Sequence, residues 1–143
     1  VVWHNGGTGG TRSWTGFNRK TKRAVVVLAN SSGTVDDIGM HLLDSESPLR
    51  TIYREVRLSE ADLKKCAGTY SFGDDDLYVT VVDGHLGVQL TGQGVNAAYP
   101  SSESHFFLKV VDAQLTFEPG EGGQMKAVVL RQNGINQRAA RKR

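Results

Sequence analysis

The sequence predicts an α+β fold in two parts: a short antiparallel sheet with one helix, then a small β-barrel led by a short helix. The first part alternates strand-like segments with a glycine-rich stretch and one amphipathic helix. The second part has roughly eight short strands of alternating polarity, spaced about 8 to 12 residues apart, as in small antiparallel barrels or sandwiches. A polar linker containing Pro48 separates them, so we expect domains over residues 1–57 and 58–143.

The first part contains three strand-like segments. Val1–Trp3 opens the chain, and Thr11–Asn18 follows a glycine-rich stretch. Ala24–Ala29 is a continuous apolar run rich in β-branched residues, which is typical of a strand buried on both faces. The chain begins on a strand-like residue without an initiator Met, so we expect the true N-terminus to lie upstream.

A helix is predicted from Thr34 to about Leu43. Asp37 stands three positions after Thr34 and would complete a capping box. Val35, Ile38 and Leu42 recur at helical spacing and would form the buried face.

The second part is expected to begin with a short helix capped by Ser59 and ended by Gly68. Asp83-Gly84 and Asn133-Gly134 are two-residue hairpin signals between strands. A barrel of this size can hold side chains alone or one small ligand, and the sequence leaves both open. Core is the commoner role for the expected inward-facing set, which is Leu86, Val88, Leu90, Leu108, Val110, Leu115 and Phe117.

Composition and charge exclude several classes of protein. The net charge of +2 is too small to indicate a nucleic-acid partner, and the basic residues from Arg138 to Arg143 are interpreted as a solvated tail. No apolar run is long enough to span a membrane. Cys66 is the single cysteine, so no internal disulfide can form.

Metal and cofactor sites are not predicted. The four histidines are scattered without metal-ligand spacing, and Asp74–Asp76 is interpreted as a solvated acidic loop because the EF-hand pattern is absent. The glycines of Gly6–Gly10 fit neither common phosphate-loop pattern, and no helix follows them. A glycine-rich turn between two strands is one interpretation of this segment.

A second interpretation comes from the order of the elements. His4-Asn5-Gly6, then Gly7-Thr8-Gly9-Gly10, two strands and an amphipathic helix resemble the end of the serine β-lactamase and penicillin-binding-protein fold, closest to its class C-like and esterase group. The resemblance implies that the first part ends a β-lactamase-like sheet. It also implies that His4 takes the place of the motif lysine, that Asn5 and Gly6 line the substrate site, and that the Gly7 N–H is an oxyanion donor.

The sequence departs from that family in a decisive respect. No serine fits Ser-x-x-Lys and no tyrosine fits Tyr-x-Asn. Acyl transfer by this mechanism needs a nucleophile and its base, so we expect the chain alone to be inactive. The resemblance implies a parent hydrolase acting on a β-lactam, a D-amino peptide or an ester, in the periplasm, the cell envelope or outside the cell.

Residues 58–143 resemble the lipocalin-like C-terminal domain of such hydrolases, through Leu58–Leu63, Cys66–Tyr70 and Leu77–Leu90. The resemblance implies an accessory module that gates substrate, holds a ligand or forms oligomers. The alternative function is therefore a non-catalytic module that binds a small ligand or assembles. Uncovered strand edges in the first part would favour a homo-oligomer, since such edges pair between chains.

Overall fold

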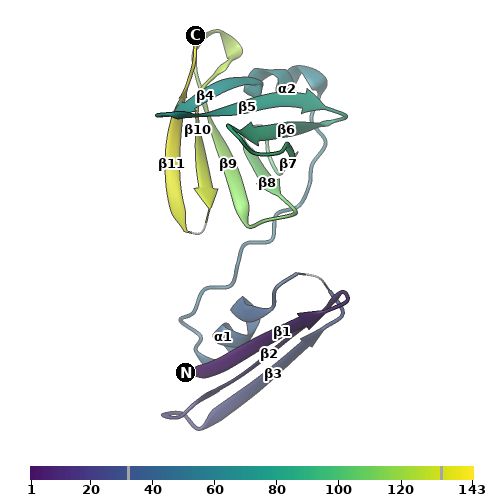
Figure 1. The fold of residues 1–143 in the computed structure, drawn as a ribbon, viewed down its shortest axis with the longest axis vertical. Helices are drawn as coiled ribbons and strands as arrows, with labels where there is room; N and C mark the ends of the chain where they lie inside the picture. Colours follow the sequence, from purple (N-terminus) through teal and green to yellow (C-terminus); the bar gives the residue numbers. More distant parts are fainter. Residues whose placement is uncertain (32, 133) are drawn as a thin grey trace. The chain divides into compact units, whose positions relative to one another are not determined.

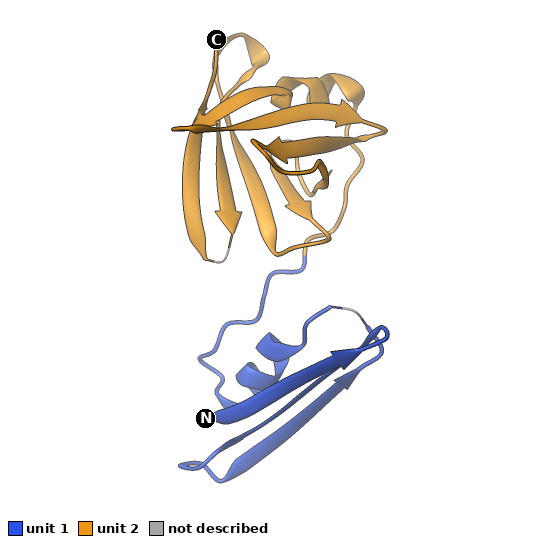
Figure 2. Ribbon diagram, in the orientation of Figure 1, with its two compact units in different colours: residues 1–52 blue, residues 53–143 orange. Residues whose placement is uncertain are grey.

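The chain folds into two compact units in the computed structural model, which describes residues 1–31, 33–132 and 134–143. Unit 1 covers Val1–Ile52 and unit 2 covers Tyr53–Arg143 (Figure 2). Unit 1 is a three-stranded antiparallel sheet with one helix, and unit 2 is a closed antiparallel barrel of eight strands with its own helix. The predicted α+β class with a small barrel is confirmed.

The sheet of unit 1 is built from β1 (Val2–Thr8), β2 (Thr11–Asn18) and β3 (Arg23–Ala29), in that order (Figure 1). β1 is longer than the predicted opening strand and includes Gly6 and Gly7. The turn into β2 falls on Gly9 and Gly10, whose φ angles of +50° and +86° suit a two-residue hairpin loop. Most of the glycine-rich segment is therefore strand.

Helix α1 (Asp36–Leu43) covers one face of this sheet. It begins after Thr34, whose Oγ1 accepts a hydrogen bond from the Asp36 N–H, and the predicted capping box does not form. The buried face holds Val35, Gly39 and Leu43, whereas the predicted Ile38 and Leu42 are exposed.

Trp14 explains which face of α1 is buried. Its ring lies so close to the helix that a Cβ on Gly39 would stand 2.2 Å from it, and a Cβ on Gly16 would stand 2.4 Å away. The two glycines make room for the indole between helix and strand. A glycine adds no hydrophobic signal, so apolar spacing predicted Val35 correctly but favoured Ile38 and Leu42 over Gly39 and Leu43.

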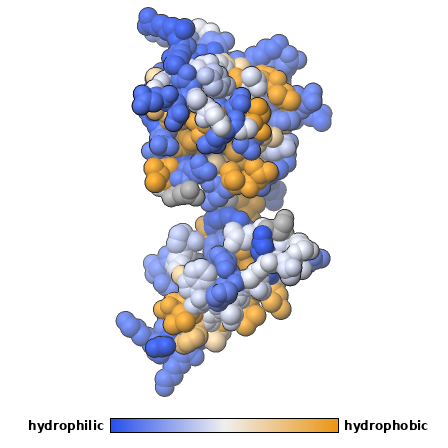
Figure 3. Space-filling model, viewed as in Figure 1, coloured by the Kyte–Doolittle hydropathy of each residue, from blue (hydrophilic) through white to orange (hydrophobic). Residues whose placement is uncertain are grey.

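The opposite sheet face has no cover within the described residues of unit 1. Val26 and Leu28 of β3 are 67% and 78% exposed, and Val2 and Phe17 of the neighbouring strands are also exposed. Figure 3 shows apolar residues along the β3 side of the sheet. The predicted burial of Ala24–Ala29 on both faces is therefore wrong for this chain, in which α1 buries one face.

Unit 2 begins with α2 (Glu60–Cys66), and its barrel closes in the order β10-β11-β4-β5-β6-β7-β8-β9. A 3-10 turn, Glu121–Gly123, precedes β10. The strands are β4 (Gly68–Phe72), β5 (Asp75–Val82), β6 (His85–Leu90), β7 (Asn96–Pro100), β8 (His105–Leu108), β9 (Ala113–Pro119), β10 (Met125–Gln132) and β11 (Ile135–Arg141).

Local signals predicted much of this unit correctly. The Ser59 side chain accepts from the Asp62 N–H and caps α2. Asp83 and Gly84 have φ angles of +42° and +82° and form the tight turn between β5 and β6. The turn signal at Asn133-Gly134 falls partly outside the described residues.

The barrel core confirms most of the expected inward-facing set. Leu86, Leu115 and Phe117 are buried, but Val110 is 72% exposed because β8 ends at Leu108 and the chain leaves the barrel wall there. Leu63 and Cys66 of α2 join the same core, so the helix closes one end of the barrel.

Candidate functional site

The predicted site residues all lie on β1, which is an edge strand. His4 pairs with Thr15 of β2, and Gly6 pairs with Ser13. Because Trp14 faces α1 and side chains alternate along a strand, His4 and Gly6 lie on the uncovered face. Asn5 pairs with Trp14 and, like Gly7, lies on the α1 face. The strand therefore divides the four predicted residues between two faces of the sheet.

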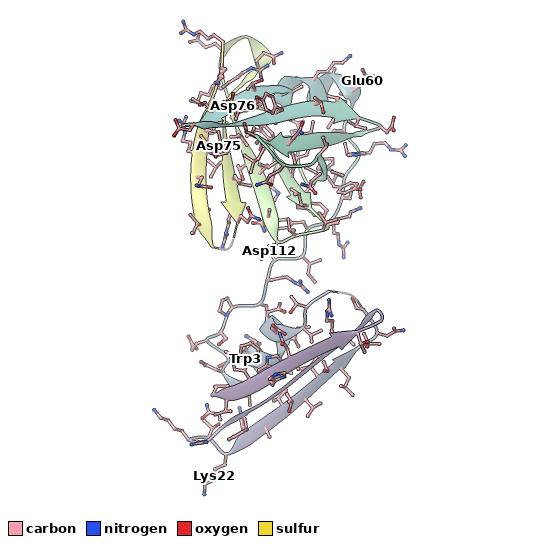
Figure 4. The ribbon with its side chains drawn as sticks, viewed as in Figure 1. Trp3, Lys22, Glu60, Asp75, Asp76 and Asp112 are labelled. Carbon is pink, nitrogen blue, oxygen red and sulfur yellow. The ribbon has the colours of Figure 1, made fainter. Side chains whose placement is uncertain are left out.

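Asn5 is held by the start of the helix. Its Nδ2 donates a hydrogen bond to the Asp36 Oδ2 at 2.7 Å. Trp3, two positions earlier on the same face, stacks on Trp14 with ring centroids 6.0 Å apart (Figure 4). These contacts attach β1 to the packed side of the sheet and leave its outer edge open.

Gly7 lies beside a cation. A Cβ at this position would stand 1.7 Å from an Nη atom of Arg12, which places the guanidinium over the strand. The end of the sheet forms an open hollow of about 470 Å³ lined by Gly6, Gly7, Thr8, Thr11, Arg12, Ser13, Leu28, Ala29 and Asn30. Thr8, Thr11, Arg12 and Ser13 contribute polar side chains to this hollow, and Leu28 of β3 contributes an apolar one.

This edge strand can bind a ligand through its backbone. An edge strand offers backbone N–H and C=O groups to an extended ligand, which can add as a further strand. Ser13 lies under the hollow on the central strand, and a Cβ on Gly6 would meet its Oγ at 3.1 Å. Among the described residues, no base forms a hydrogen bond with that hydroxyl, so these residues supply no activated nucleophile at the edge.

A serine–histidine pair does occur in unit 2. The Ser101 Oγ lies 2.6 Å from the His105 Nδ1, and burial lowers the pKa of His105. The Tyr53 ring packs on this imidazole at 4.5 Å between centroids, and the Ser101 N–H donates to the His105 carbonyl. The pair closes the β7–β8 turn and anchors residue 53 to the barrel wall, which explains why unit 2 begins there.

The described ranges show neither a metal-binding cluster nor a membrane-spanning helix. No group of three or more His, Cys, Asp or Glu residues in them is placed to hold a metal ion. No helix in the same ranges has the length and apolar character needed to cross a membrane.

Comparison with known proteins identifies a similar fold and no family. No protein family model and no curated protein matches the sequence. Two matching solved structures are described as SurE and as SurE with D-Leu, with TM-scores of 0.51 and 0.49. Both are 17% identical over 98% of this chain. The chain spans about a third of their length, 34% and 35% respectively.

These comparisons contradict the predicted family. The matching structure with a TM-score of 0.51 is described as SurE, and no family model indicates a serine β-lactamase-like origin. The physical reason lies in the motif, since the glycine string is accounted for by an edge strand and a hairpin turn with positive φ angles. The assignment to that hydrolase group is therefore corrected, and the cellular location that it implied stays a prediction without support here.

Several residues of this region escaped the sequence interpretation. Arg12 lies over Gly7, and Asp36 holds Asn5, yet neither stands in a recognisable motif. A second basic group was also missed, at the tip of the β2–β3 hairpin, where Figure 4 labels Lys22. The sequence did contain that signal, in Arg19, Lys20, Lys22 and Arg23.

Proposed function

We propose that unit 1 provides the substrate-pairing strand of a hydrolase whose nucleophile is supplied by another stretch of polypeptide. The observation that carries the proposal is the free edge of β1, where His4 and Gly6 border a sheet face without cover in the described residues. An extended ester or peptide-like substrate would pair with this edge, and His4 would orient its carbonyl.

The uncovered face supports a second polypeptide layer. Val26 and Leu28 present apolar side chains to solvent on the same face as His4. An apolar sheet face gains stability when another element packs on it. A layer packed there would stand next to the β1 edge and would be placed to contribute the missing nucleophile and base.

Chain length is consistent with this arrangement. The solved structure with a TM-score of 0.51 shares the fold over 98% of this chain, which spans 34% of its length. The fold therefore occurs elsewhere as part of a much longer polypeptide. Its description as SurE adds no substrate to the proposal.

The test compares the chain alone with the chain joined to whatever polypeptide its gene encodes upstream of Val1. Each protein is assayed with a chromogenic ester, a D-amino acid anilide and a β-lactam. The chain alone should show no turnover, and the longer protein should hydrolyse at least one substrate. Turnover by the chain alone, or an inactive and well-folded longer protein, would contradict the proposal.

Two variants of the longer protein distinguish the edge from the sheet as a whole. His4→Ala on the edge strand should lower kcat/KM by about 10- to 1000-fold, which is the range for losing one positioned group. Thr15→Ala is the matched control, because Thr15 pairs with His4 on the same face but belongs to the central strand. Equal losses in both variants would show that His4 acts only through sheet stability.

A further inference from the structure

The interior of the barrel is filled unevenly along its axis. At the end closed by α2, Phe117 packs edge-on against Tyr70 and Phe106, with ring centroids 5.7 Å and 5.5 Å apart. All three rings are almost completely buried. Figure 4 labels Glu60, the first residue of α2, near this end and Asp112, between β8 and β9, at the opposite end.

The opposite end holds a cavity of about 120 Å³. Its walls come from five barrel strands, β5, β6, β8, β9 and β10, and are aliphatic, while amides from the β6–β7 connection, β7 and β10 lie around it. None of the described residues that line it is aromatic, whereas Phe106 and Phe117 fill the other end. The lining residues are Leu77, Val88, Leu90, Leu108, Val111, Leu115 and Leu130, with Gln93, Asn96 and Gln132.

The lining defines the chemistry of a ligand. The described lining residues include no charged side chain, so an ion would lose its hydration there without gaining a partner of opposite charge. The three amide side chains can each donate and accept hydrogen bonds. An aliphatic wall favours an apolar group, and a dry engineered cavity of about 150 Å³ with a similar lining binds benzene.

We propose that this cavity is a binding site for a small uncharged amphiphile. A branched aliphatic or single-ring group would enter between Leu77, Leu115 and Leu130. Its amide, carbonyl or hydroxyl group would hydrogen-bond with Gln93, Asn96 or Gln132. The site belongs to unit 2 alone and does not depend on the hydrolase proposed for unit 1.

The cavity is part of a stable framework. Leu77, Leu115 and Leu130 are 3%, 1% and 8% exposed, so the walls are core residues of the closed barrel. Leu77 pairs with Leu90 across β5 and β6, and Leu115 pairs with Leu130 across β9 and β10. A ligand would therefore meet a preformed apolar site and would displace little protein, which is the usual form of a small-molecule pocket.

The experiment titrates the full chain, methyl-labelled at Leu and Val, with 3-methylbutanamide and benzamide. Saturable shifts confined to the methyl groups of Leu77, Leu90, Leu108, Leu115 and Leu130 would support the site. The charged analogue 3-methylbutanoate should bind at least about tenfold more weakly, because the lining has no cation to compensate the carboxylate. Equal binding of acid and amide would overturn the proposed ligand class.

Variants separate the cavity from other apolar surface. Leu115→Phe should fill the space and weaken binding of 3-methylbutanamide by about tenfold or more. Val82→Phe is the control, since Val82 is 40% exposed on the end of β5 and does not line the cavity. Gln132→Leu replaces one amide of the lining by an aliphatic side chain and should reduce the preference for the amide over an equally sized alkane.

Two results would overturn the proposal. One is the absence of saturable shifts for both probes in a protein whose spectrum shows a folded barrel. The other is a set of shifts that includes Val26 and Leu28 of unit 1 equally, which would indicate adsorption to exposed apolar surface. Neither result bears on the hydrolase assays, so the two proposals can fail separately.

Discussion

Arg141 shows how one residue joins distant parts of unit 2. Its guanidinium donates to the carbonyls of Lys65 and Ala67 at the end of α2, and to the carbonyl of Met125 at the start of β10. The last turn of a helix leaves carbonyls without helical partners, and a cation there also interacts favourably with the helix dipole. Arg141 therefore binds the closing helix to the barrel, although it lies in what the sequence indicated as a solvated tail.

Arg141→Met should destabilise unit 2 by about 2–4 kcal/mol, because several partly buried carbonyls would lose a charged donor together. Urea unfolding followed by far-UV circular dichroism measures the change. Arg138→Met is the control: Arg138 pairs with Glu118 on the surface, and losing that pair should have a much smaller effect. Equal effects of both substitutions would contradict the capping role.

Two buried groups predict how unit 2 responds to alkaline pH. Burial raises the pKa of Cys66 from 9.0 to about 12, and burial raises the pKa of Tyr70 from 10.0 to about 12. Each group holds its proton more tightly in the folded chain. Its contribution to the free energy of unfolding is therefore fully present below its pKa in the unfolded chain. That contribution is lost as pH rises toward the folded value.

The urea midpoint of unit 2 should therefore fall between pH 9 and pH 12. Cys66→Ala and Tyr70→Phe should each make the decline shallower, whatever their effect on stability at neutral pH. Tyr78→Phe is the control, because Tyr78 is 42% exposed. If the urea midpoint declines with pH as steeply in both buried variants as in the unchanged protein, other groups cause the alkaline loss of stability.

At the scale of elements, α1 is held to the sheet by close approach around Trp14. The indole lies between Gly16 and Gly39 and belongs to a small core with Val35 and Leu43. Its Nε1 has no hydrogen-bond partner within the described residues. Packing around the indole therefore positions this helix, together with the Asn5–Asp36 hydrogen bond at its start.

Gly39→Ala tests this packing, since two effects oppose each other. Alanine should favour the helix by about 1 kcal/mol, but its Cβ would stand 2.2 Å from the Trp14 ring, and such overpacking costs about 1–3 kcal/mol. We expect net loss of stability with a red shift of tryptophan emission. Leu42→Ala, at an exposed position of the same helix, should leave the stability and the tryptophan emission nearly unchanged. A stabilised Gly39→Ala protein would show that the helix moves away from the sheet at little cost.

At the scale of the whole molecule, the two units can be observed separately. Trp3 and Trp14 both lie in unit 1, and all four tyrosines lie in unit 2. Tryptophan emission therefore reports the sheet alone, and tyrosine absorbance reports the barrel. Unit 1 should be the less stable of the two, because its buried core is small and one sheet face remains exposed.

The exposed face and edges of unit 1 should make the isolated chain self-associate as its concentration rises. Replacing Val26 and Leu28 together by Lys should shift the sedimentation profile toward monomer. Leu49→Lys with Ile52→Lys is the matched control, because it adds the same charge at exposed apolar residues after α1. Equal dissociation by both pairs would attribute the change to net charge.

Several local features of this protein follow directly from its amino-acid pattern. Alternation of polar and apolar residues predicted the strands of the barrel, Ser59 predicted the start of α2, and Asp83-Gly84 predicted a hairpin. Each of these signals depends on neighbours within a few positions, so it survives without knowledge of the fold.

Which faces are covered, and where space remains, depends on how the elements pack together. The buried side of α1 depends on a tryptophan of β2 meeting Gly39, and the cavity depends on strands from β5 to β10 leaving one end unfilled. The short motif at His4 to Gly10 was compatible with more than one fold, and it misled the family assignment. Burial and cavities arise from contacts between residues distant in sequence, which local patterns do not specify.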